Sequence, residues 1–201
     1  MVESQLRARG VSDLRVLDAM LRVPRHEFIS EFYRAQAYED HPIPIGEGQT
    51  ISQPYIVALM LETLQIAPTD KVLEVGGGSG YATALLAELA AQVYSIERHP
   101  ALADKARQIL ARLDYVKVQT FTGDGSFGLP SIAPFDAILV SAAAAELPLA
   151  LISQLREGGR MIVPVGSEDS QHLQFIRIVN GHPVISPRDP VRFVPLVHDA
   201  P

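Results

Sequence analysis

The chain has 201 residues, a formal net charge of −6 and no cysteine. This length suits one domain with a full hydrophobic core, and the lack of cysteine excludes disulfides and zinc–thiolate sites. The acidic balance argues against a nucleic-acid partner, and no apolar run reaches the roughly 18 residues of a membrane helix. Since the N-terminus also lacks an apolar signal region, we expect a cytoplasmic protein.

The first fifty residues predict one amphipathic helix followed by an irregular passage. Leu14, Leu17 and Leu21 recur at helical spacing, and Ser12 or Asp13 can cap the helix. Residues 41–54, HPIPIGEGQTISQP, hold too many prolines and glycines for a regular element. The last proline of this passage suits the first turn of a second helix over YIVALMLETL.

From Lys71 onward, runs typical of strands and helices alternate. The expected strands are KVLEV (71–75), QVYSIE (92–97), VKVQTF (116–121), FDAILV (135–140) and GRMIVPV (159–165), and the expected helices are 79–90, 101–113 and 146–155. This alternation predicts a doubly wound α/β fold with a mostly parallel sheet. The last strand-like runs, 172–179 and 191–197, have no long helix between them and predict an antiparallel end.

The stretch EVGGGSGYA, which begins at Glu74, places four glycines in five positions directly after the first expected strand. In an open α/β sheet, ligands bind at such a strand-to-helix turn. Alternatively, the glycines only allow the strand and helix to pack tightly. A dinucleotide-binding turn needs Gly-x-Gly-x-x-Gly, but Tyr81 stands at the third glycine position. The observed Gly76-x-Gly78-x-Gly80 instead resembles the first motif of the S-adenosylmethionine-dependent methyltransferases.

Two acidic residues follow the next two expected strands. Glu97 lies about twenty residues beyond the glycines, where a carboxylate can bind both hydroxyls of a ribose. This position suits NAD as well as S-adenosylmethionine, and a solvated glutamate is the simpler alternative. Asp124, between Gly123 and Gly125, is either a turn residue or an acceptor for an adenine amino group.

Further stretches occur together in the order of one family. They are GQTISQPYIVALM, EVGGGSGYATALLA, YSIERHP, GDGSFGLP, APFDAILVSAAA, QLREGGRMIVPVG and VRFVPL. From about residue 14 to residue 197, the chain therefore closely resembles the protein-L-isoaspartate (D-aspartate) O-methyltransferases. The glycine motif is common to a whole superfamily, whereas TISQP and FVPL are far more specific. The family usually has Thr where this chain has Gly77, a departure that bears on cofactor affinity and not on the reaction.

The resemblance implies a Rossmann-like methyltransferase fold with a helical N-terminal segment and antiparallel C-terminal strands. It implies transfer of a methyl group from S-adenosyl-L-methionine, with S-adenosyl-L-homocysteine as product, to the free carboxylate of L-isoaspartyl residues in damaged proteins and peptides. The ester would then cyclise to a succinimide, which starts the repair. A carboxylate is already ionised at neutral pH, so no general base is needed. The six histidines show no ligand or triad spacing, and no metal site is expected.

The resemblance also implies which residues form the site. Ser52 and Thr50 are the expected catalytic residues. The expected cofactor-binding residues are Ile51, Ser52, Gly76, Gly77, Gly78, Ser79, Glu97, Arg98, Gly123, Asp124 and Gly125. The expected substrate-binding residues are Ser52, Gln53, Phe193, Val194, Pro195 and Leu196. Alternatively, Ser52 only caps the helix that starts near Pro54.

Two other functions stay open at this point. One is a related methyltransferase that acts on another carboxylate, in a small molecule or a modified peptide. The other is a cofactor-binding protein without activity, or a nicotinamide enzyme. We expect damaged proteins as partners, no nucleic acid or membrane, and a monomer. We expect a single methyltransferase domain over 1–201, composed of an N-terminal helical segment (1–45), a cofactor-binding core (46–180) and a C-terminal strand extension (181–201).

Overall fold

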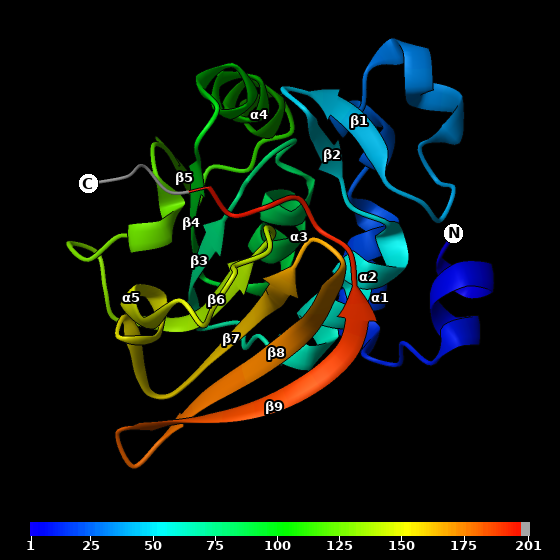
Figure 1. Cartoon of the computed structure of the whole chain (residues 1–201). Helices are drawn as coiled ribbons and strands as arrows, with labels where there is room; N and C mark the ends of the chain where they lie inside the picture. Colours follow the sequence, from blue (N-terminus) through cyan, green and yellow to red (C-terminus); the bar gives the residue numbers. More distant parts are fainter. Residues whose placement is uncertain (198–201) are drawn as a thin grey trace.

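The structure is a computed structural model that describes residues 1–197, and a seven-stranded sheet forms its centre (Figure 1). The strand order is β5-β4-β3-β6-β7-β8-β9. The first five strands in this order pair in parallel, and β8 and β9 add antiparallel to β7. The strands are β3 (Lys71–Val75), β4 (Gln92–Glu97), β5 (Val118–Thr122), β6 (Phe135–Val140), β7 (Leu155–Ser167), β8 (Ser170–Val179) and β9 (His182–Val191). The predicted fold class, a doubly wound and mostly parallel sheet with antiparallel C-terminal strands, is confirmed.

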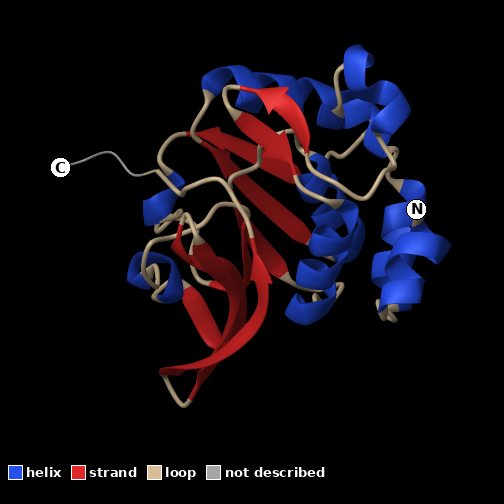
Figure 2. Cartoon of the chain, turned by 45° about the vertical axis from the view of Figure 1, so that its right-hand side comes forward, coloured by secondary structure: helices blue, strands red, loops and turns tan. Residues whose placement is uncertain are grey.

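Helices cover both faces of this sheet. They are α1 (Leu14–Arg22), α2 (Pro54–Leu64), α3 (Tyr81–Leu89), α4 (Pro100–Arg112) and α5 (Leu149–Ile152), with shorter helical segments η1 (Val2–Leu6), η2 (Arg7–Arg9), η3 (Arg25–Phe28), η4 (Glu31–Gln36) and η5 (Gly125–Phe127). Figure 2 shows the larger helices gathered on one side of the sheet. Successive strand residues point to opposite faces, so Val72 joins the core under α1 to α4 and Leu73 joins the core under α5.

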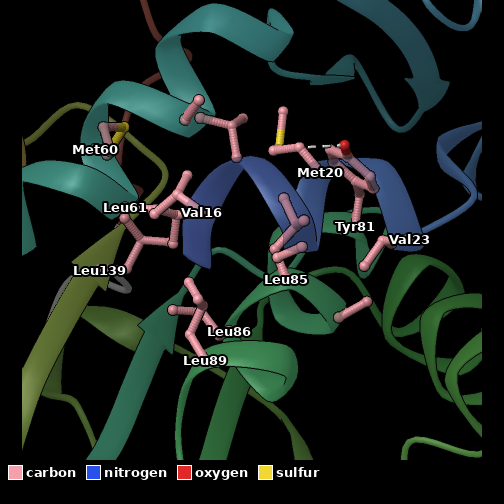
Figure 3. Close-up of a cluster of buried hydrophobic side chains, with 14 of the residues drawn as sticks. Val16, Met20, Val23, Met60, Leu61, Tyr81, Leu85, Leu86, Leu89 and Leu139 are labelled. Carbon is pink, nitrogen blue, oxygen red and sulfur yellow. Dashed lines mark hydrogen bonds between the residues drawn. The ribbon is translucent and has the colours of Figure 1, made fainter. Parts of the chain in front are cut away.

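Helix α1 packs against α2 and α3, the helices that come before and after β3 in the chain. Figure 3 shows Val16 next to Leu61 of α2, and Met20 next to Tyr81 of α3. The Tyr81 hydroxyl donates to Met20 Sδ at 3.5 Å. Leu61 and Leu85 are fully buried here, and truncating such a leucine to alanine costs about 2–5 kcal/mol. The N-terminal segment is thus part of the main core.

Residues 41–54 are more regular than expected. They contain an antiparallel hairpin of β1 (Ile43–Gly46) and β2 (Gln49–Ile51). Ile43 and Ile51 are buried and pair with each other across the hairpin. The expectation of an irregular passage was wrong because alternate isoleucines, and not the interspersed prolines and glycines, decide the structure.

The C-terminal end also differs from the prediction. The last strand is β9, and residues 192–197, expected to be a strand, make only an isolated bridge at Pro195. Prolines at 183, 187 and 190 concealed β9 in the sequence, but proline is tolerated in an edge strand such as this one. After β9 the chain crosses over the carboxyl ends of the parallel strands (Figure 1).

The expected helix over 146–155 is reduced to the four residues of α5, which follow Pro148, and β7 already begins at Leu155. The boundary expected between residues 45 and 46 falls inside β1. Of the expected C-terminal extension, residues 198–201 lie outside the described part of the chain. No helix within residues 1–197 is long and apolar enough to cross a membrane.

Candidate active site

The glycine-rich turn lies at the carboxyl end of β3, between that strand and α3. The backbone N–H groups of Gly76 and Gly77 donate to the carbonyl of Ile96 in β4, at 2.9 and 3.2 Å. Gly80 precedes α3 with φ of +87°, and a Cβ on it would lie 3.1 Å from the Cβ of Ala106 in α4. Gly80 therefore serves tight packing, which was the structural alternative for these glycines. Gly76 and Gly78 instead line an open cavity.

This glycine-loop cavity runs along the carboxyl ends of β3, β4 and β6. It is lined by Gln49, Thr50, Ile51, Ser52, Val57, Met60, Glu74, Val75, Gly76, Gly77, Gly78, Ser79, Tyr81, Ala82, Ile96, Glu97, Arg98, His99, Gly125, Leu139, Ser141, Ala142, Phe193, Val194, Pro195, Leu196 and Val197. Ligands in open α/β sheets bind at this edge, because the loops there leave a crevice between neighbouring strands.

Glu97 ends β4 and closes one side of the cavity. Its Oε2 accepts a hydrogen bond from the N–H of Gly78 at 2.8 Å, and its Oε1 accepts one from the N–H of His99 at 2.8 Å. Each carboxylate oxygen can accept a further hydrogen bond. The side chain is therefore fixed by the loop and can still accept from two vicinal hydroxyls.

A second carboxyl group, Glu74, lies fully buried beneath the glycine loop. Its Oε2 accepts from the hydroxyls of Thr83 and Ser95 at 2.5 and 2.7 Å, whereas its Oε1 has no hydrogen-bond partner among the described residues. Burial raises the pKa of Glu74 to about 7, although the two hydroxyls work against this shift. Glu74 thus offers an unused buried acceptor at the cavity wall, next to Gly77.

Gly77 is glycine for a reason that the sequence does not show. A Cβ at this position would overlap Ser95 Oγ, the same hydroxyl that holds Glu74. The side chain of Ser95 therefore occupies the space that a threonine at position 77 would need.

The stretch Thr50-Ile51-Ser52-Gln53 connects β2 to α2 and faces the opposite side of the cavity. The N-cap residue of α2 is Gln53, and its side chain does not cap the helix. Instead, Asp40 Oδ1 accepts from the N–H of Tyr55 at 3.0 Å, and Asp40 Oδ2 accepts from the Gln53 amide at 2.7 Å. The alternative that Ser52 only caps α2 is wrong, because Asp40 has that role.

Residues 193–196 line the glycine-loop cavity and are held in place by hydrogen bonds. The N–H of Ala143 donates to the carbonyl of Val194 at 2.8 Å, and the N–H of Leu196 donates to the carbonyl of Ala143 at 2.7 Å. The buried side chain of Gln171 makes two hydrogen bonds to the backbone of Phe193, at 2.7 and 3.1 Å. Residues 193–196 are therefore a fixed wall.

A second cavity, the side cavity, adjoins the first. It is lined by Pro42, Thr50, Ser52, Gln53, Ile56, Ser141, Pro190, Val191, Arg192, Phe193 and Val194. Thr50, Ser52 and Ser141 belong to both cavities, as do Phe193 and Val194. The two hydroxyl residues of the TISQP stretch therefore stand where two binding spaces meet.

The structure brings most of the residues expected from the sequence to these cavities. Those that line one or both are Thr50, Ile51, Ser52, Gln53, Gly76, Gly77, Gly78, Ser79, Glu97, Arg98, Gly125, Phe193, Val194, Pro195 and Leu196. Gly123 and Asp124 line neither. The Asp124 carboxylate accepts from the N–H of Ser126 at 2.8 Å and caps η5. A Cβ on Gly125 would lie 2.7 Å from Val75 Cγ1, so this glycine allows the turn to sit on the strand end.

Ser141 is a cavity residue that sequence reasoning missed. It directly follows β6, and its N–H donates to the carbonyl of Val75 at 2.8 Å. Its place after a central parallel strand was a usable signal, because the carboxyl ends of such strands form the binding edge. Within residues 1–197, no group of three or more histidine, aspartate or glutamate side chains is arranged to hold a metal ion. His198 lies outside the described residues.

The fold and the cavity define a class of protein. A doubly wound sheet, a Gly-x-Gly-x-Gly turn, an acid at the end of β4 and a cavity over the carboxyl ends of the strands are the features of a Rossmann-like S-adenosylmethionine-dependent methyltransferase. The residues present fit that cofactor: Glu97 can accept from the two ribose hydroxyls, and the unpartnered Oε1 of Glu74 can accept from an amino group.

Comparison with known proteins narrows the class. Residues 1–200 match the family model of protein-L-isoaspartate(D-aspartate) O-methyltransferase. The chain is 56% identical to the protein-L-isoaspartate O-methyltransferase of Koribacter versatilis, over 98% of this chain and 89% of that protein. It is 53% identical to the enzyme of the same name from Methanoculleus marisnigri, over 98% of this chain and 90% of that protein.

Two solved structures agree with this relationship. A structure titled protein-L-isoaspartate O-methyltransferase is 31% identical with a TM-score of 0.88, over 98% of this chain and 66% of that chain. A Plasmodium falciparum protein of the same family, described as putative and solved with S-adenosyl-L-homocysteine, is 29% identical with a TM-score of 0.83, over 95% of this chain and 94% of that chain. The chain belongs to the protein-L-isoaspartate(D-aspartate) O-methyltransferase family. The predicted methyl transfer from S-adenosylmethionine to isoaspartyl carboxylates is thereby confirmed.

Proposed function

We propose that the glycine-loop cavity holds S-adenosyl-L-methionine, that the side cavity holds the isoaspartyl segment of a damaged protein, and that Thr50 and Ser52 act where they meet. One observation carries this assignment: both hydroxyl residues belong to both cavities. A group transferred from one ligand to the other has to pass this junction. The Ser52 hydroxyl is available for such a role because Asp40 caps α2.

The cofactor supplies a methyl group on a positively charged sulfur, which a carboxylate oxygen can attack directly. The isoaspartyl carboxylate is an anion at neutral pH, so the enzyme has no proton to remove from it. The chain's own contribution is to orient. The hydroxyls of Thr50 and Ser52 donate to the carboxylate and fix its direction, and such positioning can supply much of the rate enhancement.

The remaining residues hold the two ligands and exclude water. Glu97 would bind the ribose, and Glu74 would accept from the amino group of the methionine part. Residues 193–196 form the wall toward the peptide, where an extended backbone can be recognised by main-chain hydrogen bonds. Closing the junction from solvent prevents water from competing with the carboxylate.

We further propose a monomeric, cytoplasmic enzyme that does not act on nucleic acids. The net charge of −6 opposes binding to phosphates, and the absence of cysteine suits a reducing compartment. Three prolines in the edge strand β9 oppose strand pairing between two copies. Light scattering on the purified protein measures its mass in solution, and the mass of a dimer would contradict the proposed monomeric state.

The decisive experiment for the activity uses two peptides that differ only at one linkage. The enzyme is given S-adenosylmethionine labelled in the methyl group, together with an isoaspartyl peptide or its normal aspartyl twin. We expect label in the isoaspartyl peptide alone, as a base-labile ester. Equal labelling of both peptides, or of neither, would contradict the proposed assignment of the side cavity to the isoaspartyl segment.

A further inference from the structure

A buried arginine touches the back of the junction between the two cavities. Arg25 begins η3 in the N-terminal segment and has no exposed surface. Its Nε donates to the carbonyl of Ala37 at 2.8 Å, and its Nη2 donates to the carbonyl of Ser52 at 2.8 Å. Its guanidinium also lies over the ring of Tyr81, 4.8 Å from the ring centre. One side chain thus connects the N-terminal segment, the Ser52 backbone and the first residue of α3.

Among the described residues, Arg25 has no carboxylate in direct contact, although Asp40 lies close enough to favour its charge. Within residues 1–197 no acidic side chain forms an ion pair with it, and Nη1 has no hydrogen-bond partner. Burial lowers the pKa of Arg25, and Tyr81 and Asp40 only partly oppose this shift. Since an arginine stays protonated in proteins, the structure holds a cation in a place that disfavours charge.

A second buried arginine shows what a purely structural arrangement looks like. Arg160 in β7 donates from Nε to the carbonyl of Leu64 at 2.8 Å, as Arg25 does to Ala37, and it also pairs with the carboxylate of Asp70. It lies toward the amino ends of the strands, opposite Ala137 near the start of β6, and lines neither cavity. A buried cation without such a partner is costly, and an apolar side chain of similar volume would be cheaper for stability alone.

We propose that Arg25 is a positioning residue for the substrate carboxylate. By holding the carbonyl of Ser52, it fixes the backbone from which the Ser52 hydroxyl projects, and its charge makes the junction more favourable for an anion. This inference rests on the proposed function of the junction. It assigns to the N-terminal segment a role in orienting the substrate carboxylate.

Four variants separate this role from a contribution to stability. Arg25→Met removes the charge and both hydrogen bonds, and Arg25→Lys keeps the charge but replaces the planar guanidinium, whose donors lie on separate nitrogens, by a single ammonium. Arg160→Met and Arg160→Lys are the matched controls at the remote buried arginine. For each protein we would measure KM and kcat for the isoaspartyl peptide, Kd for S-adenosylhomocysteine, melting temperature, and hydrogen exchange of residues 50–53.

We expect Arg25→Met to raise KM for the peptide at least tenfold and to speed exchange at residues 50–53, while Kd for S-adenosylhomocysteine changes less than threefold. In Arg25→Lys, both KM for the peptide and the exchange rate at residues 50–53 should lie between those of Arg25→Met and the wild type. The Arg160 variants should lose melting temperature without either effect. The proposal is overturned if both pairs of variants change only the melting temperature, or if exchange at residues 50–53 is unaltered in Arg25→Met. Hydrogen exchange is measured without any substrate, so it tests the role of Arg25 alone. Labelling of the isoaspartyl and aspartyl peptides by the wild-type enzyme tests the proposed function separately. A failure of this inference can therefore be distinguished from a failure of the proposed function.

Discussion

Asp40 and Tyr55 are joined by a hydrogen bond from the Tyr55 N–H to Asp40 Oδ1 at 3.0 Å, and this contact caps α2 from outside the helix. A remote cap is unusual where a serine stands immediately before the N-cap residue, because serine is a good local cap. Its consequence is that α2 does not use the Ser52 hydroxyl as its cap, and Ser52 lines both cavities.

Exchange of Ser52 for alanine should therefore separate catalysis from stability. Ser52→Ala should lower methyl transfer strongly, because a donor to the carboxylate is lost, while the melting temperature and cofactor affinity stay close to those of the wild type. Asp40→Ala should instead destabilise the protein by about 1–2 kcal/mol, the usual cost of a lost cap. Turnover assays, calorimetry with S-adenosylhomocysteine and thermal melts on both variants test this contrast.

Thr50→Val is the companion variant, since it removes the neighbouring hydroxyl at nearly constant shape. We expect a smaller loss of turnover than in Ser52→Ala, again without a loss of stability. A Ser52→Ala enzyme with full turnover would show that its hydroxyl has no part in the reaction.

Glu97 is expected to determine cofactor affinity. Glu97→Ala would remove the two charged hydrogen bonds proposed to the ribose, and it releases the N–H groups of Gly78 and His99. At roughly 1.5–3 kcal/mol for each hydrogen bond to a charged group, Kd for S-adenosylhomocysteine should rise by about two to four orders of magnitude. Glu97→Gln keeps the shape of the side chain and one acceptor oxygen. Its Kd for S-adenosylhomocysteine should therefore lie between those of the wild type and Glu97→Ala. A Kd unchanged in both variants, measured by calorimetry, would assign Glu97 to the loop alone.

Gly77 and Ser95 should prove to be energetically coupled. In Gly77→Ala the new methyl group forces the Ser95 hydroxyl away from Glu74, which should cost about 1 kcal/mol or more. In a Ser95→Ala background that hydroxyl is already absent, so Gly77→Ala should be neutral or slightly stabilising. Urea unfolding of the four proteins gives the coupling energy, and strictly additive effects would mean that the two residues act independently.

The raised pKa of Glu74 predicts a pH dependence of stability. Between its ordinary value of 4.5 and about 7, the folded protein keeps a proton that the unfolded chain has released. The group therefore favours folding at low pH, and this contribution disappears as the pH rises through about 7. The free energy of unfolding should fall by about 3 kcal/mol from this cause between pH 4.5 and 8.

Glu74→Gln provides the comparison, because a glutamine is neutral throughout this range and can still accept from Thr83 and Ser95. Urea unfolding of the cofactor-free proteins at several pH values should show a weaker pH dependence in the variant. Parallel curves for the two proteins would mean that Glu74 ionises at its ordinary pKa.

Local patterns predicted those parts of the fold that local physics decides. Strands β3, β4 and β6 are short apolar runs bounded by glycine or polar turns, and the period of the pattern identifies them. The hairpin β1–β2 and the edge strand β9 were not recognised because prolines within them obscured the alternation. Their pairing depends on neighbours, Ile51 for Ile43 and β8 for β9, that a local window does not contain.

The candidate site, like the fold, was only partly predictable from local sequence. The glycine turn, Glu97 and the TISQP stretch follow from motifs and their resemblance to a family. Asp40 and Arg25 lie in a passage without any motif, and they reach residues 15 and 27 positions away in the chain. Only the folded backbone brings such partners together, which is why a cap by Ser52 stayed open as an alternative in the sequence.

The wall formed by residues 193–196 also bears on when the enzyme becomes functional during its synthesis. Ala143 and Gln171, which hold this wall, are made well before it, as are the glycine loop and Glu97. A nascent chain can thus complete its parallel strands and its glycine turn while residues 193–196 are still within the ribosome. The side cavity therefore depends on residues 190–194, which are made after the glycine loop, so a chain that stopped before them would have the cofactor-binding turn without this cavity.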